Sequence, residues 1–199
     1  MDTNFRIVCL CGSAGALSGF VGILQNMPAD TGMAFLLLTH RRMGQPCWLP
    51  EIIARITPMC VQRVENGMAL APNHVYILPP GADMTTDGNL LSLVPSSTPQ
   101  GWPDTFDIFL KSLAQATHSR AVAVILSGMA GDGSAALDAI RTSGGITCAQ
   151  TGASYRSMPD TAIDTGNVDF AGSASEISSL LSTLLPMDQF LFGADLPRE

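Results

Sequence analysis

Short, continuous apolar runs alternate with stretches of helical spacing along most of the chain. The runs predict buried strands, and the candidates are 7–11, 34–38, 60–64, 74–78, 121–126 and 146–149. Between them, apolar residues recur every three or four positions, which predicts helices over 16–26, 49–56, 105–116, 134–142 and 173–185. This alternation is typical of an α/β fold: a doubly wound, mostly parallel sheet with helices on both faces, a Rossmann-like three-layer sandwich.

One segment departs from this alternation. Asp87-Gly88 is a hairpin signal between the short runs 83–86 and 90–94, and we expect it to add an antiparallel edge to the sheet. The stretch 95–103 is rich in Ser and Pro and predicts a loop. With no repeat and no interdomain linker, we expect a single domain over 1–199, with its core at about 6–185 and a tail over 186–199.

Composition narrows the class of protein. The chain has 199 residues, of which 46% are hydrophobic and 14% charged, which is a globular composition. A net charge of -7 argues against a nucleic-acid partner, because phosphate contacts need clustered Lys and Arg. No apolar run approaches the roughly 20 residues of a membrane helix, and the start lacks a basic signal region, so we expect no membrane insertion. Five cysteines without zinc-ligand spacing favour a reducing cytoplasm and no metal site.

Three chemically useful side chains follow predicted strands. Ser13 comes after the first strand, His40 after the second, and Asp132 in the loop after 121–126. Ligands of open α/β sheets bind at the carboxyl ends of the strands, so these residues are expected at one edge. Serine, histidine and aspartate are the attacker, the general base and the group that orients the base in nucleophilic catalysis.

Each residue alone has an ordinary explanation. A serine among small residues is most often a turn or a helix cap, a lone histidine is more often packed or exposed, and Asp132-Gly133 often only begins a helix. The turn at Ser13 lacks the Gly-Lys-Ser/Thr of a phosphate-binding loop, and its glycines have the wrong spacing for a dinucleotide fingerprint. The order Ser, His, Asp also differs from the Ser, acid, His order of α/β-hydrolases. The hypothesis of nucleophilic catalysis therefore depends on the predicted placement of Ser13, His40 and Asp132 at the same edge of the sheet.

The motifs around these residues resemble the catalytic domain of the chemotaxis protein-glutamate methylesterases. The resemblance covers about 7–185 and is most specific in the loop VILSGMAGDG, 124–133, which is similar to the family's "ILTGMGxDG". The other matching segments are VCLCGSAGAL at 8–17, LTH at 38–40, NHVYILPP at 73–80, AQ at 149–150 and SMP at 157–159. The form with Ala14, NHVY and Pro-Pro is most similar to the esterase domains of methyltransferase-methylesterase hybrids.

The resemblance implies a function for these residues. Ser13 becomes the nucleophile, His40 the base and Asp132 its orienting group, while the backbone N–H groups of Met129 and Ala14 form the oxyanion hole. The implied reaction hydrolyses γ-glutamyl methyl esters on chemoreceptor helices to glutamate and methanol, and some members also deamidate glutamine. No cofactor is needed. The implied partners are methylated receptor helices, with a separate receiver or methyltransferase protein as a further candidate.

Some positions differ from the family pattern. Cys11 and Ala16 stand where glycines are usual, and a side chain there is costly if the backbone has positive φ. Arg41 and Arg42 follow the histidine and are expected at the substrate rim together with Met158, where a cationic pair would steer an acidic receptor surface. The sequence begins at the first strand, so we expect no receiver domain. The alternative hypothesis is a catalytically degenerate domain that binds receptor helices or signalling partners.

Overall fold

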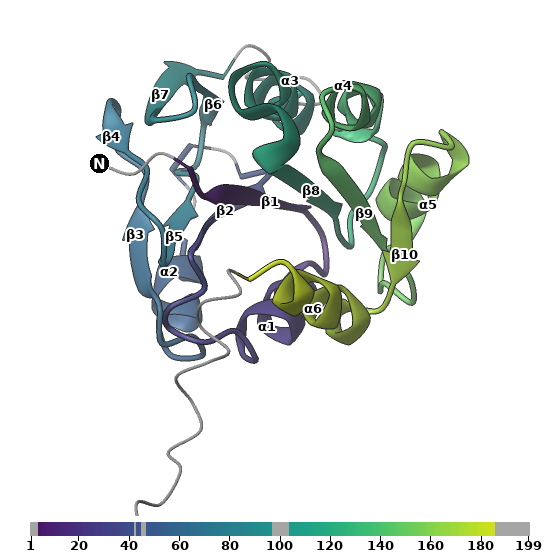
Figure 1. The fold of residues 1–199 in the computed structure, drawn as a ribbon, viewed down its shortest axis with the longest axis horizontal. Helices are drawn as coiled ribbons and strands as arrows, with labels where there is room; N and C mark the ends of the chain where they lie inside the picture. Colours follow the sequence, from purple (N-terminus) through teal and green to yellow (C-terminus); the bar gives the residue numbers. More distant parts are fainter. Residues whose placement is uncertain (1–3, 42, 45–46, 97–103, 186–199) are drawn as a thin grey trace, which may run out of the picture.

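A seven-stranded parallel sheet runs through the middle of the computed structural model, which describes residues 4–41, 43–44, 47–96 and 104–185 (Figure 1). Its strand order is β10-β9-β8-β1-β2-β5-β3, and every neighbouring pair is parallel. The strands are β1 (Arg6–Gly12), β2 (Met33–Thr39), β3 (Cys60–Arg63), β5 (His74–Ile77), β8 (Ala121–Ile125), β9 (Ile146–Gln150) and β10 (Phe170–Gly172). The predicted parallel sheet is therefore confirmed, with β1 near its centre.

Helices cover both faces of the sheet, as the alternation predicted (Figure 1). One layer contains α1 (Leu17–Leu24), α2 (Leu49–Ile53) and α6 (Ala174–Thr183). The other contains α3 (Thr105–Thr117), α4 (Leu137–Thr142) and α5 (Ser157–Asp164), with the 3-10 turns η1 (His118–Arg120) and η2 (Ser134–Ala136) beside them. Among the described residues, no helix has the length and apolar character needed to cross a membrane.

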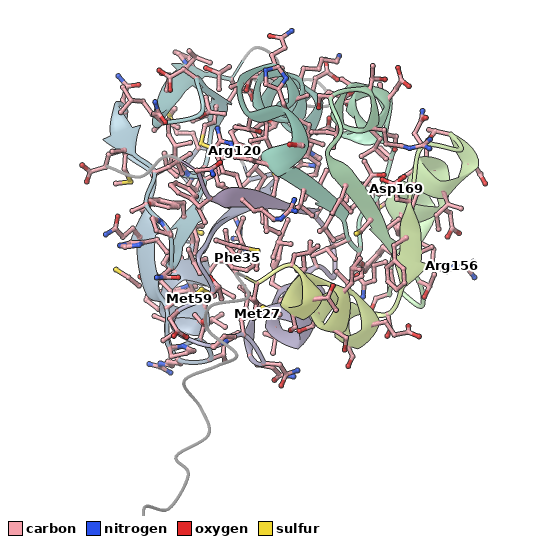
Figure 2. The ribbon with its side chains drawn as sticks, in the orientation of Figure 1. Met27, Phe35, Met59, Arg120, Arg156 and Asp169 are labelled. Atoms are coloured by element: carbon pink, nitrogen blue, oxygen red, sulfur yellow. The ribbon has the colours of Figure 1, made fainter. Side chains whose placement is uncertain are left out.

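The central strand supplies both hydrophobic cores. Ile7 and Cys9 pack on the α3–α4 side, whereas Val8 and Leu10 pack on the α1–α6 side, because successive strand residues point to opposite faces. Figure 2 shows Met27, Phe35 and Met59 gathered on the α1–α2 side, where each is almost fully buried. A sheet covered on both faces explains why its strands have no alternating polar positions.

The hairpin at Asp87-Gly88 forms, but not at the edge of the main sheet. Strands β6 (Ala82–Thr86) and β7 (Leu90–Pro95) join β4 (Met68–Ala69) in a separate antiparallel sheet of order β4-β7-β6. Asp87 Oδ1 accepts the N–H groups of Asn89 and Leu90 at 2.9 and 2.8 Å, which lowers the pKa of Asp87. The small sheet packs on α3, since the Thr105 hydroxyl donates to Asp83 at 2.7 Å. The position predicted for the hairpin was therefore wrong.

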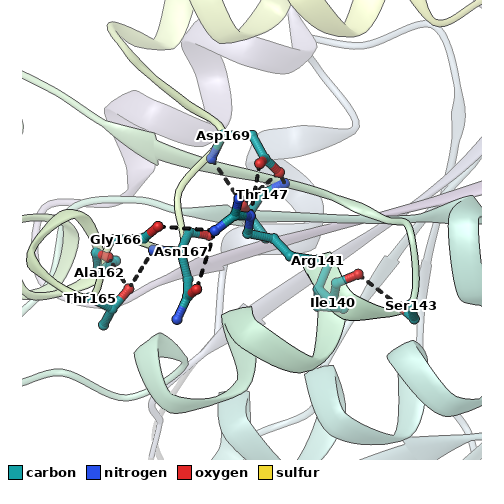
Figure 3. A network of polar contacts seen from close by, with 9 residues as sticks. All are labelled: Ile140, Arg141, Ser143, Thr147, Ala162, Thr165, Gly166, Asn167 and Asp169. Atoms are coloured by element: carbon teal, nitrogen blue, oxygen red, sulfur yellow. Dashed lines mark hydrogen bonds and ion pairs between the residues drawn. The ribbon is translucent and has the colours of Figure 1, made fainter.

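A polar network fixes the far edge of the sheet, where the sequence patterns predicted neither α5 nor β10 (Figure 3). Arg141 Nε of α4 lies 3.0 Å from Asp169 Oδ1, and the Thr147 N–H and hydroxyl both donate to Asp169 Oδ2 at 2.9 Å. Arg141 also donates to the Gly166 carbonyl at 3.0 Å. Asp169 therefore connects α4 and β9 at the residue before β10. The predicted tail, 186–199, and most of the predicted loop, 97–103, lie outside the described residues.

Candidate active site

Strand register brings Ser13 and His40 out of the sheet side by side. Gly12, the last residue of β1, pairs with Thr39, the last residue of β2, so the next residue of each strand is at the same level. Neighbouring strands are about 4.8 Å apart. On the other side of β1, the Ser13 N–H donates to the Ser127 carbonyl, just beyond β8, at 2.9 Å. The carboxyl ends of three adjacent strands therefore converge at Ser13.

Asp132 reaches His40 from the loop after β8. His40 Nε2 lies 2.7 Å from Asp132 Oδ2, and the two side chains are only 13% and 6% exposed. The same carboxylate accepts the Phe106 N–H at 2.9 Å and the Asp107 N–H at 3.1 Å, in the first turn of α3. A carboxylate is favourable there, because a helix N-terminus has unsatisfied N–H groups and a positive dipole end. Asp132 thus caps α3 and holds His40 at once.

The His40 ring is fixed by a second contact. It stacks on Phe106 with ring centroids 4.0 Å apart and an interplanar angle of 11°. When Nε2–H donates to the carboxylate, the neutral imidazole keeps its free lone pair on Nδ1, which makes Nδ1 the nitrogen available as a base. Sequence reasoning missed Phe106, because its helix lies far along the chain and its apolar spacing indicated only a core position.

Ser13 and His40 line one cavity of about 570 Å³. This volume is within the range of small-ligand sites, about 300–1,000 Å³. Among the hydrogen bonds of the described residues, none joins the Ser13 hydroxyl to His40. A distance of about 4 Å between Ser13 Oγ and a His40 nitrogen therefore stays a prediction. Catalytic hydrogen bonds are often formed only with substrate present.

The turn after Ser13 is held by Ser127, which sequence reasoning also missed. The Ser127 hydroxyl donates to the Ala14 carbonyl at 2.8 Å and accepts the Tyr155 N–H at 3.0 Å. Gly15 has φ +70, and a Cβ there would lie 2.8 Å from Ser127 Oγ, so the turn requires glycine. Ser127 is fully buried, and through its carbonyl and hydroxyl it contacts both Ser13 and Ala14.

Two backbone N–H groups on the loops after β1 and β8 are available as donors. In the described part of the chain, neither the Ala14 N–H nor the Met129 N–H donates to a protein acceptor. Ala14 follows Ser13 directly, and Met129 follows Gly128, whose own N–H donates to the Tyr155 carbonyl at 3.0 Å. Available backbone N–H groups close to a nucleophile are the donors that an oxyanion hole requires, and the assignment of Ala14 and Met129 to this role stays a prediction.

Several ionisable groups lie behind the site. Burial, followed by the charge of Asp132, raises the pKa of Asp107, and Lys111 opposes the shift. Burial and the neighbouring Cys9 raise the pKa of the Cys11 thiol, so it stays protonated. Among the described residues, no three His, Cys, Asp or Glu side chains are grouped as they would be around a metal ion.

Comparison with known proteins identifies the family. The family model described as CheB methylesterase matches residues 8–181. The chain belongs to the CheB methylesterase family. A solved structure, the Thermotoga maritima CheB methylesterase catalytic domain, superposes with a TM-score of 0.85 at 24% identity, over 92% of this chain and 100% of that one.

Curated relatives are longer than this chain. A protein-glutamate methylesterase/protein-glutamine glutaminase 3 of Myxococcus xanthus is 33% identical over 83% of this chain and 46% of its own length. An uncharacterized 104.1 kDa protein of Rhodobacter capsulatus is 36% identical over 75% of this chain but only 16% of its own length. The chain thus spans about half or less of these relatives.

Two residues that replace glycines of the CheB pattern, Cys11 and Ala16, do not have the positive φ that would make a side chain costly. Cys11 is a buried strand residue and Ala16 has φ -70, and neither is among the non-glycine residues with positive φ in the described chain. Ala130, by contrast, has a positive φ of +68, and it lies in the loop at a position where the family motif has glycine. Left-handed backbone costs an alanine about 1 kcal/mol. The strain lies one residue after Met129.

The three expected rim residues have different positions. Arg41 is exposed and lines the cavity with Ser13 and His40, whereas Arg42 lies outside the described residues. Met158 is fully buried, and a Cβ on Gly128 would lie 2.8 Å from its sulfur, so it packs beneath the loop of Met129 rather than at an open rim.

Proposed function

We propose that this chain hydrolyses γ-glutamyl methyl esters on chemoreceptor helices to glutamate and methanol, with Ser13, His40 and Asp132 as its catalytic triad. The observation that carries the proposal is the 2.7 Å contact between His40 and Asp132, with His40 lining the same cavity as Ser13. Family membership supports it, and the names of the curated relatives support a second activity, conversion of glutamine to glutamate.

Acylation begins when Ser13 Oγ attacks the ester carbonyl carbon. His40 Nδ1 takes the serine proton, and Asp132 stabilises the resulting imidazolium through Nε2–H. The carbonyl oxygen becomes negative and accepts hydrogen bonds from the Ala14 and Met129 N–H groups. When the tetrahedral intermediate collapses, the bond to the methoxy group breaks, His40 gives its proton to that oxygen, and methanol leaves.

Deacylation repeats these roles with water. His40 Nδ1 takes a proton from water as its oxygen attacks the glutamyl-Ser13 ester, and the proton then passes to Ser13 Oγ as that bond breaks. The products are glutamate and the original enzyme. With a glutamine side chain, ammonia replaces methanol as the leaving group, and no other step changes. The residues complete this cycle without a cofactor.

The test measures methanol and ammonia released from a methylated receptor fragment. We expect Ser13→Ala and His40→Ala to remove turnover almost entirely while far-UV circular dichroism stays that of the folded protein. Ser18→Ala is a matched control, because Ser18 is exposed in α1 and its hydroxyl only donates to the Gly15 carbonyl at 3.2 Å. Full activity in Ser13→Ala would assign the nucleophile elsewhere.

A binding domain without turnover is the competing function. It predicts that the wild-type chain retains the methylated fragment on a column but releases neither methanol nor ammonia. The negative φ of Ala16 and the strand position of Cys11 remove the backbone argument at those two positions, whereas Ala130 has a positive φ where the family motif has glycine.

A further inference from the structure

Large exposed apolar side chains gather around the site rather than scattering over the surface. In the described part of the chain they are Leu17, Met43, Trp48, Ile52, Leu90, Val94, Met129 and Tyr155. Leu17, Trp48 and Ile52 line the cavity of Ser13 and His40. Only Leu90 and Val94 belong to the small antiparallel sheet. Gathered apolar surface of this kind marks an interaction site.

The remaining three flank the same edge. Met129 and Tyr155 lie on the two loops joined by the hydrogen bond from the Gly128 N–H to the Tyr155 carbonyl. Met43 lies against Gly81, where an added Cβ would meet it at 2.8 Å. These three residues do not line the cavity, but their segments add exposed apolar groups near it.

The cavity has two chemically distinct parts. Its polar part is Ser13, Thr39, His40 and Arg41, which include the proposed nucleophile and base. Its apolar part includes Leu17, Trp48 and Ile52, which we call the apolar wall and which are 44%, 68% and 37% exposed. Among its described lining residues there is no carboxylate. One glutamyl methyl ester needs only the polar part of a cavity of about 570 Å³.

We propose that the apolar wall is a subsite for a large apolar side chain of the substrate, located one helical turn from the methylated glutamate. The inference rests on the proposed function, in which the ester stands on a receptor helix. Side chains three or four residues apart on a helix lie about 5–6 Å apart on one face, so a neighbour of the ester enters the same cavity. The occupant is thus an amphipathic helix, read through its apolar face.

Trp48 contributes most of this subsite. It has the largest side chain of the wall and the largest exposed fraction, so it has the most surface to lose to a partner. Tryptophan is enriched among residues that dominate binding energy, because its rigid ring buries a large area at low entropic cost. Net charge does not attract the substrate helix to this chain, since the chain has a net charge of -7 and glutamate-bearing helices are acidic.

The experiment uses two synthetic helical peptides that carry γ-methyl glutamate. One has leucine three and four residues to either side of the ester, and the other has serine at those positions. Methanol release gives kcat/KM for the wild type, Trp48→Ala and the control Leu90→Ala, which removes an exposed apolar group on the small sheet. We expect a wild-type preference for the leucine peptide that falls about tenfold in Trp48→Ala and is unchanged in Leu90→Ala. An unchanged preference in Trp48→Ala overturns the subsite.

A binding arm separates this inference from the proposed function. The chain has two tryptophans, so Trp102→Phe leaves Trp48 as the only indole, and adding Ser13→Ala prevents turnover. We expect the leucine peptide, and not the serine peptide, to shift Trp48 emission to shorter wavelength. If the wild type hydrolyses neither peptide, the proposed function fails while this shift still decides the subsite. A shift that grows with protein concentration alone would assign the wall to a second copy of the chain and overturn the proposal.

Discussion

Replacing Asp132 with asparagine tests whether this carboxylate both caps α3 and orients His40. Asp132 accepts three N–H groups, from His40, Phe106 and Asp107, at 2.7, 2.9 and 3.1 Å. Asparagine has one acceptor oxygen and an NH₂ group in place of the other. If its oxygen keeps His40 and Phe106, its NH₂ group faces the Asp107 N–H; the reverse orientation presents a donor to His40. Either way at least one donor loses its partner.

The magnitude follows from these contacts. A hydrogen bond to a charged acceptor contributes about 1.5–3 kcal/mol, and a charge at a helix N-terminus about 0.3–1 kcal/mol. Loss of the negative charge also relieves repulsion of Asp107, which offsets part of the cost. We expect the free energy of unfolding to fall by about 2 kcal/mol, which lowers Tm by about 4–8 °C in a chain of this size.

Urea denaturation followed by circular dichroism measures the stability change, and a chromogenic ester measures turnover. We expect turnover to fall by about 10⁴, the loss known when a triad histidine is held in the wrong tautomer. Asp138→Asn is the matched control, because Asp138 is exposed in the first turn of α4 and should change stability by less than about 0.5 kcal/mol. If Asp132→Asn unfolds at the same urea concentration as the wild type, the capping argument is wrong.

Three further predictions concern the loop of Ala130, the half-buried carboxyl of Asp107 and the arginines at the rim. Ala130→Gly should raise the free energy of unfolding by about 0.5–1 kcal/mol in urea titrations, because it removes left-handed strain; destabilisation would contradict the strain. Since the pKa of Asp107 is raised in the fold, wild-type stability relative to Asp107→Asn should be greatest below the ordinary pKa of aspartate and decline as pH rises through the raised value; a flat difference from pH 3 to 8 would refute this. Arg41→Ala with Arg42→Ala should lower kcat/KM on a receptor substrate mainly at low salt, and an equal loss at every ionic strength would exclude steering.

Local patterns predicted the main sheet but not every element. Continuous apolar runs identified β1, β2, β8 and β9, because burial on both faces leaves a direct mark on the sequence. The helix α5 begins Ser-Met-Pro-Asp and has no clear apolar spacing, and β10 has only three residues, too few to form a recognisable apolar run. The Asp87-Gly88 signal specifies a hairpin, but a turn contains no information about which sheet its strands join.

The candidate site divides in the same way. Ser13, His40 and Asp132 could be predicted because strand ends have a defined place in this fold class. Phe106 and Ser127 could not, since each acts through a contact between segments that no spacing rule links. The positive φ of Ala130 could not be predicted either, because alanine rarely adopts it and the path of the loop imposes it.

The cap that Asp132 places on α3 has an evolutionary consequence. Its carboxylate accepts two backbone N–H groups that need a partner whether or not any ester is hydrolysed. Selection for folding alone would therefore preserve this aspartate in a descendant that had abandoned catalysis. His40 has no comparable duty, since its hydrogen bond and its ring stack place it without supporting any helix end. Among relatives, the loss of this histidine would consequently mark an inactive member more reliably than the aspartate's presence marks an active one.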